Sequence, residues 1–341
     1  MAASRLHRQK RTVLSLTTRF CLPHEGMTEL EYLSRGSAFL LDSTAPPASS
    51  SAIAANALPK LHDLKILTCQ HVACPWLFPK YFADKWDWLQ HVSEEFVHHS
   101  LQLLELPADG VTRFQPRVLL DIPLAQQVWL HPERDLALLA VDEHDEARWS
   151  ELVAQWSLHA VALEPAGSKP GDLLLFSGHK QQQEEDTKDA ASDASSTAST
   201  SSDESQEEEA EADTVGQYPK QVLGRFVGQS ARGQAFAWSE EILEEGMCGG
   251  AVLNEAGDCV GLVEGIVPPY DPKAAHAAAV LSSDATPAER EAATAAAATA
   301  RMQKALENHV AFVPSIEIHD FLKDTAADHC LLTGMGLDLE N

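Results

Sequence analysis

The sequence predicts an all-β protein built from two antiparallel β-barrels, with helical insertions and a disordered acidic loop. Short apolar or β-branched runs alternate with Gly, Pro and Asp turns along most of the chain, as barrel strands do. The length of 341 residues suits two such barrels, and a hydrophobic content of 44% supplies an ordinary globular core. Two long segments without the strand pattern, Gln181 to Val215 and Asp271 to Asn308, are therefore predicted insertions.

The same pattern divides the chain into five parts. They are an N-terminal extension (1–10), a first barrel (11–143), a linker (144–157), a second barrel (158–326) and a C-terminal tail (327–341). Both insertions, at 181–215 and 271–308, interrupt the second barrel. We expect an active site in the cleft between the two barrels.

The first barrel opens with the predicted strand Thr12 to Phe20. The first 24 positions contain no acid and five basic residues: Arg5, Arg8, Lys10, Arg11 and Arg19. This composition resembles a mitochondrial presequence. Because cleavage after such a presequence would remove the strand, only residues 1–10 remain for a signal, and the compartment stays open.

Further strands of the first barrel are expected at Ile66–His71, Val118–Ile122 and Gln127–Leu130, with another after Asp135. Each is a short apolar or alternating run between turn residues.

An aromatic insertion, Pro75 to Leu101, is predicted to be helical. It either walls the substrate cleft or packs as a small core of its own. His91, His98 and His99 fall near one face of that helix. Without an acidic or thiol partner at metal-ligand spacing, we expect them to be solvated and not to bind zinc.

The second barrel is predicted to contain a strand at Leu173–Phe176. Its acidic insertion is rich in Ser, Asp and Glu and holds almost no large apolar residue. The segment cannot bury enough surface to offset the entropy of ordering. It either offers phosphorylation sites or only solubilises the protein.

The Ala-rich insertion begins a helix at Thr286, followed by Pro287 in the first turn and Glu289 three residues after the cap. The helix is expected to end near Leu306. Three roles stay open for this helix: a lid, a docking surface for a partner, or an addition to the barrel without a function of its own.

The run Gly246-Met247-Cys248-Gly249-Gly250 carries the clearest chemical signal. Gly246 tolerates backbone angles that a Cβ resists, so nearby N–H groups can turn toward one point. The N–H groups of Gly246 and Cys248 would then form an oxyanion hole beside a thiol nucleophile. The alternative is a structural cysteine in a Gly-rich turn.

Two other residues favour the catalytic interpretation. His71 follows the apolar run from Ile66, and Asp135 opens an apolar strand. The chain order His71, Asp135, Cys248 is that of a triad in which an acid orients a histidine and the histidine activates a nucleophile.

Motifs along most of the chain resemble trypsin-like, chymotrypsin-fold peptidases of the HtrA/Deg type without their PDZ domain. The matching segments are Arg35–Leu41, Ile66–Ala73, Asp135–Leu139, Lys169–Gly178, Gly246–Leu253, Gly257–Val263 and His309–Ser315. Three residues depart from the family pattern: Ala38 replaces Gly, Met247 replaces Asn and Cys248 replaces Ser. The sequence G-x-C-G-G is similar to that of picornavirus-type chymotrypsin-like cysteine proteases.

The resemblance implies an endopeptidase acting on polypeptides through His71, Asp135 and Cys248. It also implies that the stretch before the nucleophile, including Ile242 and Leu243, helps to form a pocket for an apolar side chain. Two alternatives stay open: an inactive pseudoprotease that serves as a scaffold or assembly subunit, and a chaperone-like protein that holds unfolded chains.

The net charge of −26 makes nucleic acid an unsuitable partner and favours basic peptides. No run of 18 apolar residues occurs, so no membrane span is expected. The six cysteines form no dense framework, which indicates reduced thiols in an intracellular protein, cytoplasmic or mitochondrial. Cys69 and Cys74 are two core thiols or a redox-controlled pair. No metal or other cofactor is expected, and the oligomeric state is left open.

Overall fold

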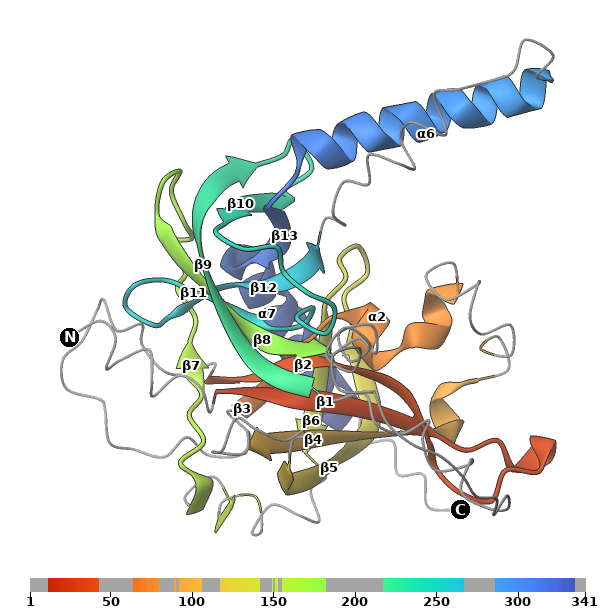
Figure 1. The fold of residues 1–341 in the computed structure, drawn as a ribbon. Coiled ribbons are helices and arrows are strands. Elements are labelled where there is room, and N and C mark those ends of the chain that lie inside the picture. The colour runs from red at the N-terminus through yellow and green to blue at the C-terminus, as the bar shows by residue number, and fades with distance from the viewer. Residues whose placement is uncertain are drawn as a thin grey trace, which may run out of the picture.

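The computed structural model describes residues 12–42, 64–79, 89, 92–105, 117–141, 149, 151–152, 155–181, 217–266 and 286–334. These residues form two closed, six-stranded antiparallel barrels packed against each other (Figure 1). The predicted all-β class is therefore confirmed, and the architecture is that of a chymotrypsin-like double barrel. No helix in the described part of the chain is both long and apolar enough to cross a membrane.

The first barrel closes through the pairing of its first two strands in sequence. Its strands are β1 (Val13–Phe20), β2 (Glu31–Asp42), β3 (Leu64–Thr68), β4 (Val97–Glu105), β5 (Arg117–Leu130) and β6 (Ala137–Val141). Their order is β1-β4-β5-β6-β3-β2, with β2 returning to β1. A two-residue strand, β7 (Val161–Ala162), adds to β2 in parallel. The short helix η1 (Pro23–Glu25) connects β1 and β2.

The second barrel follows the same plan. Its strands are β8 (Leu173–Gln181), β9 (Gln217–Gln229), β10 (Ala235–Ser239), β11 (Ala251–Leu253), β12 (Cys259–Ile266) and β13 (His309–Pro314). Their order is β10-β13-β12-β11-β8-β9, closed by β9 and β10. The predicted N-terminal extension and the acidic insertion beyond Gln181 lie outside the described residues.

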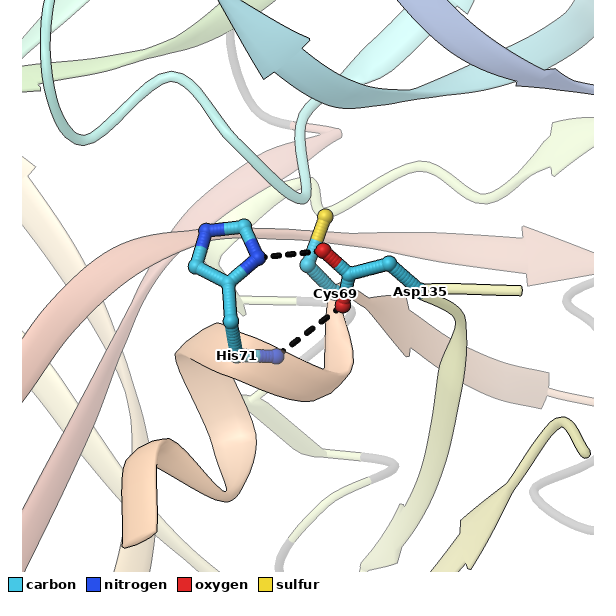
Figure 2. A group of neighbouring side chains, drawn as sticks. All are labelled: Cys69, His71 and Asp135. Atoms are coloured by element: carbon cyan, nitrogen blue, oxygen red, sulfur yellow. Dashed lines mark hydrogen bonds and ion pairs between the residues drawn. The ribbon is translucent and has the colours of Figure 1, made fainter. Parts of the chain in front are cut away.

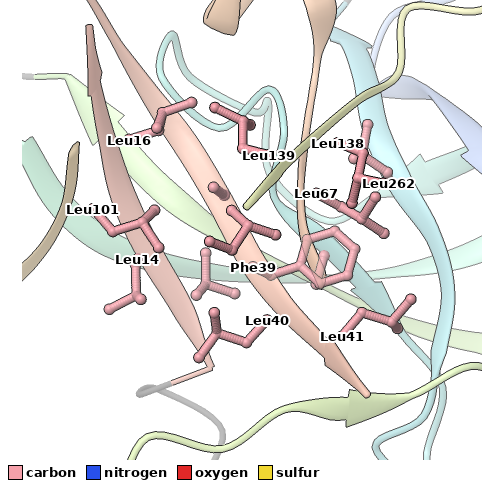
Figure 3. Close-up of a cluster of buried hydrophobic side chains, with 14 of the residues drawn as sticks. Leu14, Leu16, Phe39, Leu40, Leu41, Leu67, Leu101, Leu138, Leu139 and Leu262 are labelled. Carbon is pink, nitrogen blue, oxygen red and sulfur yellow. The ribbon is translucent and has the colours of Figure 1, made fainter. Parts of the chain in front are cut away.

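One hydrophobic core runs through the first barrel and across the junction with the second. Figure 3 shows Phe39 and Leu67 of the first barrel in the same cluster as Leu262 of the second. All three side chains are fully buried. Burial of each such side chain contributes about 1.5–3 kcal/mol. The shared core therefore fixes the relative position of the strand ends that carry the candidate site.

Helix α7 (Ser315–Gly334) starts directly after β13 and fastens the two barrels together. Its side chains Ile318, Phe321 and Leu322 belong to the core cluster of the first barrel. The helix continues past 327, where the sequence predicted a tail, because no glycine or proline interrupts it before Gly334.

A bidentate ion pair joins α7 to the loop between β5 and β6. The Arg134 guanidinium donates through Nη2 to Glu317 Oε1 at 2.6 Å and through Nε to Oε2. The rings of His131 and Phe321 pack beside this pair with centroids 5.3 Å apart. The loop that leads to Asp135 is thus held from both sides.

Replacement of Glu317 by alanine is expected to lower the free energy of unfolding by about 1–2 kcal/mol, since it leaves a partly buried guanidinium without its carboxylate. Urea unfolding measures the effect. Asp320→Ala is the matched control, because Asp320 lies on the same helix in an exposed ion pair with Lys323. Equal midpoints for the two variants would contradict the prediction.

The aromatic insertion differs from its prediction. Among its described residues are the short helices η3 (Pro75–Leu77) and η5 (Glu94–Phe96), and its last residues, from Val97, are strand β4. His98 is exposed and His99 is buried, with Nε2 of His99 2.8 Å from the Ala73 carbonyl oxygen. The helical and solvated predictions are therefore wrong for His99, because the two-residue period of a strand places adjacent residues on opposite faces. His91 lies outside the described residues.

The helix predicted in the Ala-rich insertion is present as α6 (Pro287–Ala305). The Arg290 N–H donates to the Thr286 carbonyl at 3.0 Å, so the first turn begins at the expected residue. Figure 1 shows α6 extending away from the barrels between β12 and β13. Its Met302 side chain is 63% exposed. The helix is therefore supported mainly by the high helix propensity of alanine.

Candidate active site

His71 lies in helix α2 (Gln70–Ala73), one turn that follows β3 directly. The sequence predicted a strand that ends in His71, but the strand ends at Thr68. The cause is local, because the Cys69 carbonyl accepts hydrogen bonds from the N–H groups of Val72 and Ala73 at 3.2 and 3.1 Å. The turn lifts the imidazole away from the sheet.

Asp135 holds His71 at two points, as Figure 2 shows. The backbone N–H of His71 donates to Oδ1 at 3.0 Å, and the ring Nδ1 pairs with Oδ2. The second ring nitrogen points away from the carboxylate. Gln70 supports the arrangement by donating to the carbonyls of His131 and Leu136 at 2.5 and 3.3 Å, which ties the Asp135 loop to α2.

Cys248 arrives from the second barrel, on the loop that precedes β11. Its side chain is half-buried, and its carbonyl accepts a hydrogen bond from the Ser37 N–H at 3.1 Å. Gly246 and Gly249 flank it with φ of +90° and +82°. A Cβ on Gly249 would lie 2.1 Å from the Ser37 carbonyl oxygen, so only glycine permits this close approach.

The imidazole of His71 lies between the Asp135 carboxylate and the Cys248 sulfur. Burial by itself lowers the pKa of His71. The hydrogen bonds of the ring with Asp135 and Cys248 outweigh this effect, and the negative charges of these two partners add to them. The pKa of His71 therefore rises from 6.5 to about 10. The His71 ring thus has an acidic partner in its own barrel and a thiol partner in the other. The raised pKa of His71 favours the protonated ring, which has a proton to give.

The two N–H groups predicted to form an oxyanion hole are those of Gly246 and Cys248. Among the described residues, neither donates a hydrogen bond to a protein acceptor. The neighbouring N–H groups of Met247, Gly249 and Gly250 all do, at 3.2, 2.9 and 3.0 Å. Two unused donors beside a thiol can receive the charge that develops on a carbonyl oxygen during nucleophilic attack.

Cys69 is a second thiol beside the histidine. Its Sγ, an imidazole nitrogen of His71 and a carboxylate oxygen of Asp135 lie within 4.8 Å of one another, a separation that a metal ion could bridge. However, burial, followed by the negative charge of Asp135, raises the pKa of the Cys69 thiol well above its ordinary value. The thiol donates to the Val263 carbonyl at 3.0 Å, and Nδ1 of His71 is engaged by Asp135. The donor set therefore fits a metal poorly.

The other buried thiols are also unsuited to nucleophilic attack. Burial raises the pKa of Cys74 to about 12, with a further contribution from Glu94, and burial raises the pKa of Cys259 to about 12. Cys69 and Cys74 are both free thiols. Cys248 is thus set apart from these three by its partial exposure and its contact with the imidazole.

The predicted substrate pocket rested on Ile242 and Leu243, which differ in exposure. Ile242 is 38% exposed, but Leu243 is 3% exposed and packs in the core of the second barrel with Leu174 and Phe176. Both residues lie in the loop between β10 and β11, which turns the Leu243 side chain inward. A cleft of about 450 Å³ lies elsewhere on the second barrel, between the segment Pro165–Pro170 and strands β9 and β13.

Three residues that the sequence did not single out contact the site. Ser37 bonds to the nucleophile loop, and the Phe78 ring lies edge-on to His71 with centroids 6.2 Å apart. Glu264 Oε1 accepts the Asp135 N–H at 3.5 Å. Ser37 lies in one of the motifs that resemble the peptidase family, and Phe78 lies in the aromatic insertion that was a candidate wall of the cleft, whereas Glu264 lies in a segment without a motif of its own.

Comparison with known proteins adds no further constraint: no protein-family model matches the chain, and no curated protein matches it.

Proposed function

We propose that the protein is an endopeptidase that cleaves peptide bonds with Cys248 as its nucleophile. The observation that carries the proposal is the position of the His71 ring, hydrogen-bonded to Asp135 on one side and to Cys248 on the other. The chymotrypsin-like double barrel supports it, since this fold brings a histidine and an acid of one barrel to a nucleophile of the other.

The proposed reaction follows from this geometry. His71 takes the thiol proton of Cys248, the thiolate attacks the carbonyl carbon of the scissile bond, and the N–H groups of Gly246 and Cys248 receive the negative oxygen. His71 then donates its proton to the leaving nitrogen, the C–N bond breaks and a thioester remains. Water attacks the thioester as His71 takes up one of its protons, and the thiolate leaves. Asp135 keeps the ring in the productive orientation throughout.

Charge and local surface define the proposed substrate class. The chain has a net charge of −26, and the exposed Glu245 and the partly buried Glu264 flank the site. These groups favour polypeptides that carry basic residues near the cleaved bond. Ile242 is the remaining candidate for contact with an apolar side chain of the substrate.

A scaffold without activity is the second candidate. It is favoured by Met247, which is fully buried in the core of the second barrel at the position next to the nucleophile. It is also favoured by α6, whose exposed surface extends away from both barrels.

A thiol-reactive peptide probe distinguishes the two candidates. A peptidyl chloromethyl ketone with an apolar terminal residue is expected to label wild-type protein at Cys248, as peptide mass spectrometry reports. Cys21→Ala, which removes another partly exposed thiol, is the matched control and should label normally. Failure of wild type to react, or reaction that persists in Cys248→Ala, would overturn the protease and leave the scaffold.

A further inference from the structure

We propose that Ser37 is a positioning residue of the active site, whose hydroxyl holds Gly246 in the conformation that presents the oxyanion N–H group. The inference rests on the proposed function, and it assigns to the first barrel a part in building the oxyanion hole of the second. Ser37 lies in β2 and is fully buried.

The hydroxyl of Ser37 bridges two backbone groups of the second barrel. Its Oγ donates to the Gly246 carbonyl at 2.7 Å and accepts from the His179 N–H at 2.7 Å. A group that donates and accepts at once is required here, and of the small side chains only a hydroxyl does both. Alanine at this position would leave a buried carbonyl and a buried N–H group without partners.

The main chain of Ser37 contacts both the loop that carries Cys248 and the strand that leads to His71. Its N–H donates to the Cys248 carbonyl at 3.1 Å. Its carbonyl accepts from the Thr68 hydroxyl at 2.7 Å, three residues before His71. Every polar atom of Ser37 is therefore engaged, and two of these bonds end on the loop that carries the nucleophile.

Gly246 needs such restraint because glycine rotates more freely than any other residue. Its φ is +90°, and both of its peptide units are held by hydrogen bonds. The Gln181 N–H donates to the Glu245 carbonyl at 2.7 Å and fixes the preceding unit, and Ser37 fixes the following unit. The Glu245 carbonyl and the Gly246 N–H belong to the same trans peptide and point in opposite directions. Because Gln181 holds the carbonyl, the Gly246 N–H points away from Gln181.

Loss of the Ser37 bond would leave the following unit held only by the Met247 N–H, which donates to the Glu244 carbonyl at 3.2 Å, and would loosen the turn that presents the Gly246 N–H. The thiol and the histidine keep their own contacts, because Ser37 Oγ touches neither. The hydroxyl should therefore affect steps that place negative charge on the substrate oxygen and should spare steps that do not.

The test compares two reactions of Cys248 in wild type and Ser37→Ala. Alkylation by iodoacetamide forms no oxyanion and is expected to stay within about twofold of wild type. Hydrolysis of a fluorogenic peptide is expected to fall by about 10²–10³-fold, in kcat and not in KM. Inhibition by a peptide aldehyde, whose adduct carries the same oxygen, should weaken in parallel.

Two further comparisons separate this role from general stability. Ser239→Ala removes another buried hydroxyl that donates to a carbonyl, that of Asn308 at 3.0 Å, and it should keep full activity. Ser37→Thr and Ser37→Val add the same bulk, and only the threonine keeps the hydroxyl, so hydrolysis should recover in the threonine variant alone.

The possible results are distinct. Hydrolysis by Ser37→Ala at the wild-type rate, or equal losses of alkylation and hydrolysis, would overturn the positioning role while the protease stands. A wild-type protein that neither hydrolyses the peptide nor binds the aldehyde would overturn the protease, and the role of Ser37 with it.

Discussion

Substitution of Cys248 by alanine is expected to reduce peptide hydrolysis by at least about 10⁴-fold, the scale of losing a covalent nucleophile. Alanine removes the sulfur that would bond to the substrate and leaves the backbone donors of the loop in place. A residual rate above that of water is therefore expected from the oxyanion N–H groups and from substrate binding. A fluorogenic peptide assay measures the loss directly.

Cys248→Ser is the companion variant, since it keeps a nucleophilic atom beside His71. It should retain part of the activity, because the surrounding frame resembles that of serine enzymes. Cys259→Ala is the matched control: this thiol is fully buried in β12 and donates to the Gly261 carbonyl at 3.3 Å. Full hydrolysis by Cys248→Ala would refute the assignment of the nucleophile.

Asp135→Asn is expected to lower kcat by about 10³–10⁴-fold while the fold persists. The amide is nearly the same size as the carboxylate, but it cannot balance an imidazolium and it favours the wrong ring tautomer. The pKa of His71 should fall from about 10 toward 6.5, since Asp135 is one of the two partners that raise it. Histidine titration followed by NMR measures the shift.

The same variant makes a prediction for stability. A histidine whose pKa is raised on folding stabilises the native state fully below pH 6.5, and this contribution is lost as pH rises through about 10. The free energy of unfolding of wild type should therefore fall more between pH 7 and 10 than that of Asp135→Asn. Parallel pH profiles for the two proteins would show that the carboxylate does not hold the imidazolium.

The sequence was sufficient for the parts of the fold that depend on local pattern. Alternating runs predicted the strands, and Thr286 and Pro287 predicted the start of α6. His71 and Asp135, which motif spacing singled out, are in direct contact. Such features are visible because a two-residue period, a helix cap or a motif is written in consecutive residues.

Features that depend on distant residues could not be predicted. Leu243 looked available to a substrate, but it lies in the loop between β10 and β11 and packs in a core whose other members are far apart in the sequence. The hydroxyl of Ser37 meets Gly246 across 209 positions, and Arg134 meets Glu317 across 183. No local period records such contacts, and without aligned relatives a single sequence gives no sign of which pairs meet.

The position of α7 has a consequence for the order of events during synthesis. The helix follows β13 in the chain, yet its apolar face completes the core around the first barrel and its Glu317 holds the loop that leads to Asp135. A growing chain that has already released His71, Asp135 and Cys248 from the ribosome still lacks this support. The loop that holds Asp135 against His71 is thereby completed only after the last strand of the second barrel has been made.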